Sequence, residues 1–125
     1  MSQRLLLAIA GIGGAMSAAI DAAARHLLAA DPYRLELATT SARYGLVHAA
    51  ALVGLALWYS RSRWFGAAGW CFAAGLALFC GSLDAVALGG SADLVVLTPW
   101  GGTAFILGWL ILAMAAWRMR PPTPD

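Results

Sequence analysis

The chain has 125 residues, of which 62% are hydrophobic and 11% are charged, and its formal net charge is +2. Soluble domains average about half apolar and a quarter charged residues, so this composition excludes an ordinary soluble domain. A net charge this small, with no basic run, gives no indication of a nucleic-acid partner. The mean hydropathy of +0.76 indicates a protein of the lipid bilayer.

Four apolar segments are long enough to cross a bilayer, which takes about 20 helical residues. We expect transmembrane helices at residues 4–28, 40–59, 64–88 and 99–117. Because backbone polar groups in hydrocarbon must be satisfied within the segment, these spans are predicted to be helices. Residues 1–120 then form one all-α, polytopic domain, a four-transmembrane-helix bundle. The proline-rich residues 121–125 are expected to be a disordered tail.

The first span also has features of a secretory signal peptide, because Arg4 precedes an apolar run and small residues follow it. The apolar stretch continues past the usual length of a signal, however. We therefore interpret it as a retained helix.

The connections carry helix start signals. Asp31 and Pro32 are typical of an N-cap followed by proline at the first helical position. A short amphipathic helix is therefore predicted to begin at Pro32 and run into the second span. Residues 60–63, Ser-Arg-Ser-Arg, predict a tight turn between the second and third spans, and Thr98-Pro99 repeats the start signal for the fourth.

The arginines predict the orientation in the membrane. Arg4 precedes the first span, Arg61 and Arg63 lie between the second and third, and Arg118 and Arg120 follow the fourth. With four spans these positions share one side, which the positive-inside rule assigns to the cytoplasm. Both termini are therefore expected in the cytoplasm.

Small residues four apart predict where the helices pack, because they permit close approach in lipid. The longest stripe lies in the third span and shorter ones lie in the first two: Gly69, Ala73, Ala77, Gly81 and Ala85; Gly11, Ala15 and Ala19; Gly45 with Ala49, and Ala50 with Gly54. A compact bundle is the expected result.

Seven polar side chains are predicted to gather at one depth near the outer third of the membrane: Asp21, Arg25, His26, Arg43, Tyr44, His48 and Asp84. Asp21 and Arg25 have the spacing of a helical ion pair. Asp84 lies at the edge of the small stripe of the third span, so it is predicted to face the bundle. A carboxylate in an apolar medium is costly unless it is paired or neutral.

Three interpretations of this cluster are open. The groups neutralise one another and fix the helix register, or they bind a proton, an ion or a small ligand. Alternatively, His26 and His48 are the axial ligands of a haem, since imidazole suits that role. Beyond these two histidines the sequence has no metal-ligand spacing, so neither a metal nor a cofactor is predicted. The fourth span begins with free N–H groups that are able to receive Asp84 or an anionic ligand.

Several short motifs resemble the small bacterial inner-membrane family labelled domain of unknown function 423. They are DAAARH ending at His26, YGLVH with Tyr44 and His48, FCGSLD with Phe79, Gly81, Ser82 and Leu83, TPWGG with Thr98, Pro99, Gly101 and Gly102, and the pair Gly108-Trp109. The resemblance covers about residues 5–117. It implies the fold and a multi-pass location in the bacterial inner membrane, and it implies no activity.

This chain departs from the family pattern at its added charges. Asp21 and Arg25 stand where the family tends to have small residues, and Asp84 stands where it tends to have tyrosine. We hypothesise that Asp84 pairs with Arg25 or Arg43 across the bundle, replacing a tyrosine hydrogen bond with an ion pair.

Three classes of function are compatible with the sequence. Small size and short loops favour a non-enzymatic accessory or assembly subunit of a larger membrane complex, or a homo-oligomer. A small transporter or channel would use the polar cluster, although no charge lies near the bilayer centre. A haem- or quinone-binding redox protein would use His26 and His48. No nucleophile–base motif and no phosphate loop is present, so an enzyme is not predicted.

Overall fold

Helices account for nearly all of residues 2–118, the part of the chain that the computed structural model describes. The α-helices are α1 (Ser2–Leu27), α2 (Pro32–Leu57), α3 (Arg63–Gly75), α4 (Gly81–Ala87) and α5 (Thr98–Arg118). A π-helical segment, Leu76–Cys80, joins α3 to α4, and short 3₁₀ segments at Tyr59–Arg61 and Ala92–Leu97 precede α3 and α5. The tail predicted at residues 121–125 lies outside the described residues.

The predicted helix start at Asp31-Pro32 is confirmed by its cap. The side chain of Asp31 accepts a hydrogen bond from the backbone N–H of Arg34 at 3.1 Å, and Pro32 opens α2. The expected short helix at Pro32 is therefore continuous with the second span. Ser62, which lies in the predicted turn, accepts a hydrogen bond from the backbone of Trp64 at 3.3 Å and caps α3. The predicted start signal at Thr98 is not used as a cap, because Thr98 is helical and the 3₁₀ segment capped by Ser91 runs directly into α5.

Three helices are long and apolar enough to cross a membrane: Ser2–Leu27, Arg63–Ala87 and Ala92–Arg118. The helix α2 is of similar length but is not among them. Its first half, from Pro32 to Arg43, carries Arg34 and Glu36 and lowers its hydropathy. Length and composition alone thus distinguish three of the four expected spans.

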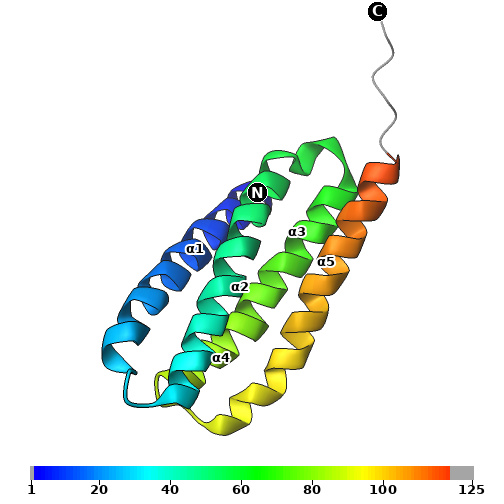
Figure 1. Cartoon of the computed structure of the whole chain (residues 1–125). Coiled ribbons are helices and arrows are strands. Elements are labelled where there is room, and N and C mark those ends of the chain that lie inside the picture. The colour runs from blue at the N-terminus through cyan, green and yellow to red at the C-terminus, as the bar shows by residue number, and fades with distance from the viewer. Residues whose placement is uncertain (1, 119–125) are drawn as a thin grey trace, which may run out of the picture.

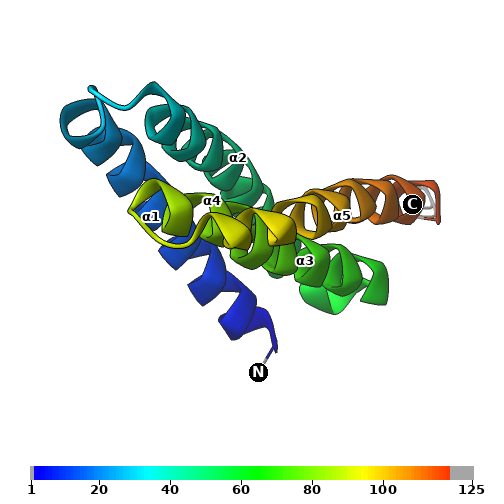
Figure 2. The ribbon, with the colours of Figure 1, turned by 90° about the horizontal axis from the view of Figure 1, so that it is seen from below.

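The long helices lie side by side in the order α1, α2, α3 and α5 (Figure 1). Most contacts of α1 are with α2, and most contacts of α5 are with α3 and the π-helical segment. Seen from below, the α1–α2 pair and the α3–α5 pair diverge from a central crossing where α2 meets α3 and α4 (Figure 2). The arrangement is more open than the compact bundle expected from the small stripes.

Only some residues of the predicted small stripes contact a neighbouring helix. Gly69 lies against Leu6 and Leu52, and Gly45 lies against Ser17, so these glycines do bring helices together. Ala77 and Gly81 of the third span are exposed, and so are the stripe Gly11, Ala15 and Ala19 of α1 and the pair Ala50 and Gly54 of α2. Spacing predicts that residues share a face, but it does not say whether a neighbouring helix covers that face.

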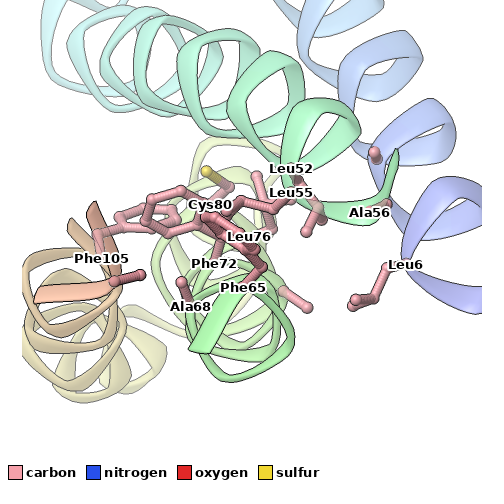
Figure 3. Close-up of a cluster of buried hydrophobic side chains, with 13 residues drawn as sticks. Leu6, Leu52, Leu55, Ala56, Phe65, Ala68, Phe72, Leu76, Cys80 and Phe105 are labelled. Atoms are coloured by element: carbon pink, nitrogen blue, oxygen red, sulfur yellow. The ribbon is translucent and has the colours of Figure 1, made fainter. Parts of the chain in front are cut away.

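The principal core lies where α2, α3 and α5 meet, and α1 contributes Leu6 and Ala10 to it (Figure 3). Phe72 and Leu52 are fully buried at its centre, Phe105 enters from α5 and Leu6 from α1. A second, smaller cluster, Ala24, Ala38 and Ala87, joins α1, α2 and α4 near the opposite end. The packing of these side chains holds the helices in place, and these helices carry the polar side chains of the candidate site.

The described segments that carry the basic residues predicted to share one side lie at one end of the molecule, and Arg120 lies outside the described residues. The beginning of α1, the α2–α3 turn and the end of α5 are at the same end (Figure 1). The guanidinium of Arg118 lies 5.0 Å from the ring centre of Trp64, and Arg61 lies 5.5 Å from that of Trp58. Cation–π contacts of this kind are typical of residues that meet at a membrane–water boundary.

Candidate functional site

The seven polar side chains expected in one cluster lie in four different places. Asp21, Arg25 and Arg43 line a shallow depression, His26 is exposed, Tyr44 and His48 join an aromatic cluster, and Asp84 lines a groove on another face. The prediction of a single cluster is wrong because equal depth along a helix does not mean equal direction. Each residue turns the side chain by about 100° around the axis.

The depression between α1 and α2 holds the predicted helical ion pair. Arg25 Nη2 lies 3.2 Å from Asp21 Oδ1, which confirms that prediction. Arg43 of α2 lines the same depression, with Thr39 and Leu46. The pair is exposed, and exposed pairs contribute about 0–1 kcal/mol, so it contributes little to the fold.

His48 is buried, and both of its ring nitrogens are engaged. Its Nδ1 lies 2.8 Å from the carbonyl oxygen of Tyr44, and Trp109 Nε1 donates to its Nε2 at 3.1 Å. A carbonyl only accepts and an indole N–H only donates, so the pattern assigns a neutral ring with the proton on Nδ1. The imidazole also stacks on Phe105 at a centroid distance of 3.6 Å.

His26 lies apart from His48, in the last turn of α1, where it is exposed. His48 lies sixteen residues into α2, roughly 24 Å from Pro32 at 1.5 Å per residue. The structure therefore does not bring the two histidines together as axial ligands. Within residues 2–118, no group of three or more His, Cys, Asp or Glu side chains is arranged to hold a metal ion.

The start of α5 packs tightly on the π-helical segment. A Cβ at Gly101 would overlap the backbone of Phe79, so only glycine permits this approach. Beside it, the hydroxyls of Ser82 and Thr98 are hydrogen-bonded at 2.7 Å. The helix start thus faces Ser82, whereas the sequence suggested that it receives Asp84.

Asp84 is buried without a charge partner. It is 8% exposed, and its Oδ1 has no hydrogen-bond partner among the described residues. The ion pairs in residues 2–118 are Asp21–Arg25 and Asp31–Arg34, so the hypothesis that Asp84 pairs with Arg25 or Arg43 is wrong. Arg25 is already bound one turn away on its own helix, and Asp84 lines a groove on a different face.

An apolar groove runs between α1 and the continuous helix of α3, the π-helical segment and α4. Its volume is about 310 Å³, and it is partly open to the outside. The lining from α1 is Ile9, Ile12, Gly13, Met16 and Ser17, and that from the facing helix is Ala73, Leu76, Ala77, Cys80, Gly81 and Asp84. We call this space the Asp84 groove. Asp84 is the one acidic side chain in its lining.

The π-helical segment was not predicted from the sequence. It lies directly before α4 and contributes Leu76, Ala77 and Cys80 to the groove. Ser41 of α2 fixes it, because its hydroxyl donates to the carbonyl of Cys80 at 3.3 Å while the Cys80 thiol donates to the Ser41 carbonyl at 3.6 Å. A wide turn of this kind often occurs at functional sites in helices.

Comparison with known proteins identifies the family. The profile described as "Protein of unknown function (DUF423)" matches residues 20–102. The UPF0382 inner membrane protein YgdD of Escherichia coli (strain K12) is 32% identical over 124 residues, which are 96% of this chain and 95% of YgdD. The chain belongs to the DUF423 family.

Other members of the DUF423 family are also membrane proteins by name. A UPF0382 membrane protein of Haemophilus influenzae is 31% identical over 91% of this chain and 94% of its own length. YwdK of Bacillus subtilis is 33% identical over 66% of this chain and 69% of its own length. No solved structure matches the chain significantly. The chain is thus a helical membrane protein of a family without an assigned function.

The motifs of α2, the π-helical segment and α5 on which the DUF423 resemblance was based meet in space, whereas the motif that ends at His26 lies apart. Tyr44 contacts Phe79 at a ring distance of 5.0 Å, and His48 contacts Trp109 and Phe105. These residues come from α2, the π-helical segment and α5. Since their hydrogen bonds and ring contacts are satisfied within the molecule, the shared motifs build the helix junction. Asp84, which departs from the motif, has one oxygen, Oδ1, without a hydrogen-bond partner in residues 2–118.

Proposed function

We propose that this protein is a four-span inner-membrane protein with both ends in the cytoplasm. We further propose that it acts as a non-enzymatic accessory subunit that binds a transmembrane helix of a larger membrane complex. The observation that carries this proposal is an outward face of α1 made of small residues, which we call the small face: Ala8, Gly11, Ala15 and Ala19.

All four residues of the small face are exposed, because α1 packs within the molecule through other positions: Leu6, Ala10, Ser17 and Ala24. A Cβ placed on Gly11 would meet nothing within 4 Å. Lipid tails are as apolar as side chains, so helices associate in a bilayer mainly where small residues let their backbones approach closely. The small face has this property, and no helix within residues 2–118 covers it.

The short connections support a role within the membrane. Between the long helices, residues 28–31, 58–62 and 88–97 are too few to form a soluble domain. His48 is hydrogen-bonded to the Tyr44 carbonyl and to Trp109, and the hydroxyls of Ser82 and Thr98 are hydrogen-bonded to each other. A molecule without a soluble domain can still bind another membrane protein through the face of one of its helices.

The four-span topology is supported by length and charge. The 26 residues of α2 extend roughly 39 Å at 1.5 Å per residue, which is enough to cross the hydrocarbon core. The beginning of α1, the α2–α3 turn and the end of α5 lie at one end of the molecule (Figure 1), and their sequences contain Arg4, Arg61 and Arg118. The positive-inside rule assigns a side rich in arginine to the cytoplasm.

Site-specific photocrosslinking in the native membrane tests the accessory role. A photoreactive residue at Ala15 is expected to give one adduct of defined mass with another membrane protein. The same residue at Ile106, on the exposed side of α5, is expected to give only lipid adducts. Gly11→Leu should reduce the Ala15 adduct by about tenfold, since a loss of about 1.4 kcal/mol of packing has that effect.

Gly54→Leu is the matched control, because a Cβ at Gly54 also meets nothing within 4 Å and this glycine lies on α2. It should leave the adduct unchanged. An adduct of twice the mass of the chain would show that the partner is a second copy of the chain and not a subunit of a larger complex. Lipid adducts alone at Ala15, with stable protein, would contradict the proposal.

A further inference from the structure

We propose that the Asp84 groove binds an amphiphile with a primary ammonium head, which pairs with Asp84, and an apolar chain, which lies along the groove. This site is separate from the small face of α1. Ile12 and Met16 line the groove, whereas Gly11 and Ala15 point about a third of a turn away around the same helix.

The size and lining of the groove suit an alkyl chain. Its volume of about 310 Å³ lies at the lower end of the range of small-molecule sites, about 300–1,000 Å³. The walls are aliphatic, from Ile9 and Ile12 on one side to Leu76 and Ala77 on the other. From Asp84 to Ala73 the helix advances eleven residues, roughly 16 Å, which gives the length available to a chain.

Asp84 supplies the specificity. It lines the groove, is 8% exposed, and has an oxygen without a partner in residues 2–118. A buried polar atom without a partner is costly, and a buried carboxylate is much more so. Two arginines of the neighbouring helices α1 and α2, Arg25 and Arg34, already pair with Asp21 and Asp31. A ligand that brings its own positive charge and N–H donors removes this cost.

The other groups of the groove exclude different ligand classes. Ser17 and Cys80 are the only further side chains with hydrogen-bonding atoms in the lining, and neither carries a positive charge. A head group that carries a carboxylate or phosphate and no ammonium group would be repelled by Asp84. A hard divalent cation would need about six oxygen ligands, which this lining does not contain.

The position of Asp84 matches the entry of an amphiphile from the membrane surface. Asp84 lies in the last turn of α4, close to the end of the span, and the apolar lining continues inward from it. The head then remains near the interface while the chain extends into hydrocarbon. The ammonium group has two sources, a free alkylamine or an aminophospholipid, and the experiment distinguishes them.

Carbodiimide coupling provides a direct test, because it joins a carboxylate and an adjacent primary amine into an amide. The carbodiimide takes up the water that is released and becomes a urea. The full chain is placed in phosphatidylcholine nanodiscs and treated with dodecylamine and dicyclohexylcarbodiimide. Peptide mass spectrometry is expected to find the dodecylamide on Asp84 at a yield at least about tenfold above that on Asp21 or Asp93. One charge-assisted hydrogen bond between the amine and Asp84 is enough to raise the occupancy by this factor. Replacing dodecylamine with ethanolamine, which has no chain, should abolish the adduct on Asp84.

A second arm measures binding without coupling. Dodecylamine should raise the midpoint of thermal unfolding, followed by tryptophan fluorescence, and dodecanol should not. Asp84→Asn should abolish the shift, and Asp21→Asn should retain it. Gly81→Leu fills the groove without a clash, because a Cβ there meets nothing within 4 Å, and it should also abolish the shift, whereas Gly54→Leu should not.

The source is resolved by repeating the coupling in nanodiscs that contain phosphatidylethanolamine and no alkylamine. A phospholipid adduct on Asp84 supports the proposal and names a membrane lipid as the ligand. Its absence, with the dodecylamide still formed, supports a free amine. Equal coupling at Asp84 and at the exposed acids, or a thermal shift that persists in Asp84→Asn, overturns the proposal.

Discussion

At the scale of single residues, the contrast between His48 and Asp84 is informative. Both are buried polar groups within helices. His48 has a donor partner and an acceptor partner, so its burial is compensated and it contributes to the helix junction. Asp84 has an oxygen that no described residue satisfies. A buried polar group whose hydrogen bonds are all made has a structural role, whereas one that lacks a hydrogen bond indicates that a partner is missing.

Trp109→Phe should destabilise the protein by about 1 kcal/mol, because it leaves His48 Nε2 without a donor while keeping most of the aromatic packing. The free energy of unfolding of the purified protein, measured in mixed micelles, gives this value. A double-mutant cycle with His48→Phe isolates the pair, and the second substitution should add little once the first is present.

Trp117→Phe is the control for this measurement, since Trp117 is 92% exposed and has no described hydrogen bond. It should be nearly neutral. If Trp109→Phe is equally neutral, the hydrogen bond to His48 does not stabilise the junction.

At the scale of elements, the π-helical segment Leu76–Cys80 sets the relation between α3 and α4. Gly101 allows α5 to contact its backbone at Phe79, and Ser41 holds its Cys80 carbonyl from α2. The segment is therefore fixed from two sides by neighbouring helices. Since it also contributes to the Asp84 groove, its conformation determines the shape of that groove.

Gly101→Ala should destabilise the protein by about 1–3 kcal/mol, because the added methyl overlaps the Phe79 backbone and forces α5 away from the π-helical segment. Gly102→Ala is the matched substitution one residue later, where a Cβ would lie 3.7 Å from Phe79 Cδ2, an ordinary contact. It should be neutral or slightly stabilising, since alanine favours helix over glycine. Equal unfolding free energies for the two variants would argue against tight packing at Gly101.

At the scale of the whole molecule, the helices form an open arrangement with two outward features on α1, the small face and one wall of the Asp84 groove. The central helix α2 provides nine buried positions, whereas α1 and α5 provide four each. The outer helices therefore have the most surface free for lipid, ligand or partner.

Cysteine accessibility in intact cells tests the proposed topology. In a chain with Cys71→Ala and Cys80→Ala, a cysteine at Ser60 should react with a membrane-impermeant thiol reagent only after the membrane is opened. A cysteine at Ser91 should react without opening, because the α4–α5 connection is expected on the outer side. Reaction of both positions from the same side would mean that α2 and the helix of α3 and α4 do not both cross the membrane as proposed.

Much of the fold could be predicted from the sequence. The helix start at Pro32 follows from a capping aspartate and a proline, which act locally. The Asp21–Arg25 pair follows from helical spacing alone. The candidate site was not accessible in the same way. The proposed pairing of Asp84 with an arginine depended on which faces of α1, α2 and α4 meet, and the open packing turned those faces elsewhere.

The sequence by itself determined a helical membrane protein of the DUF423 family, since composition, apolar length and family motifs are properties of the chain read locally. The tertiary structure decided that His48 is bonded to Trp109, that Gly101 meets Phe79, and that Asp84 lines a groove without a partner. The physical reason is that helical periodicity fixes direction only relative to a helix's own axis. Which neighbour stands in that direction depends on the packing of all the helices together.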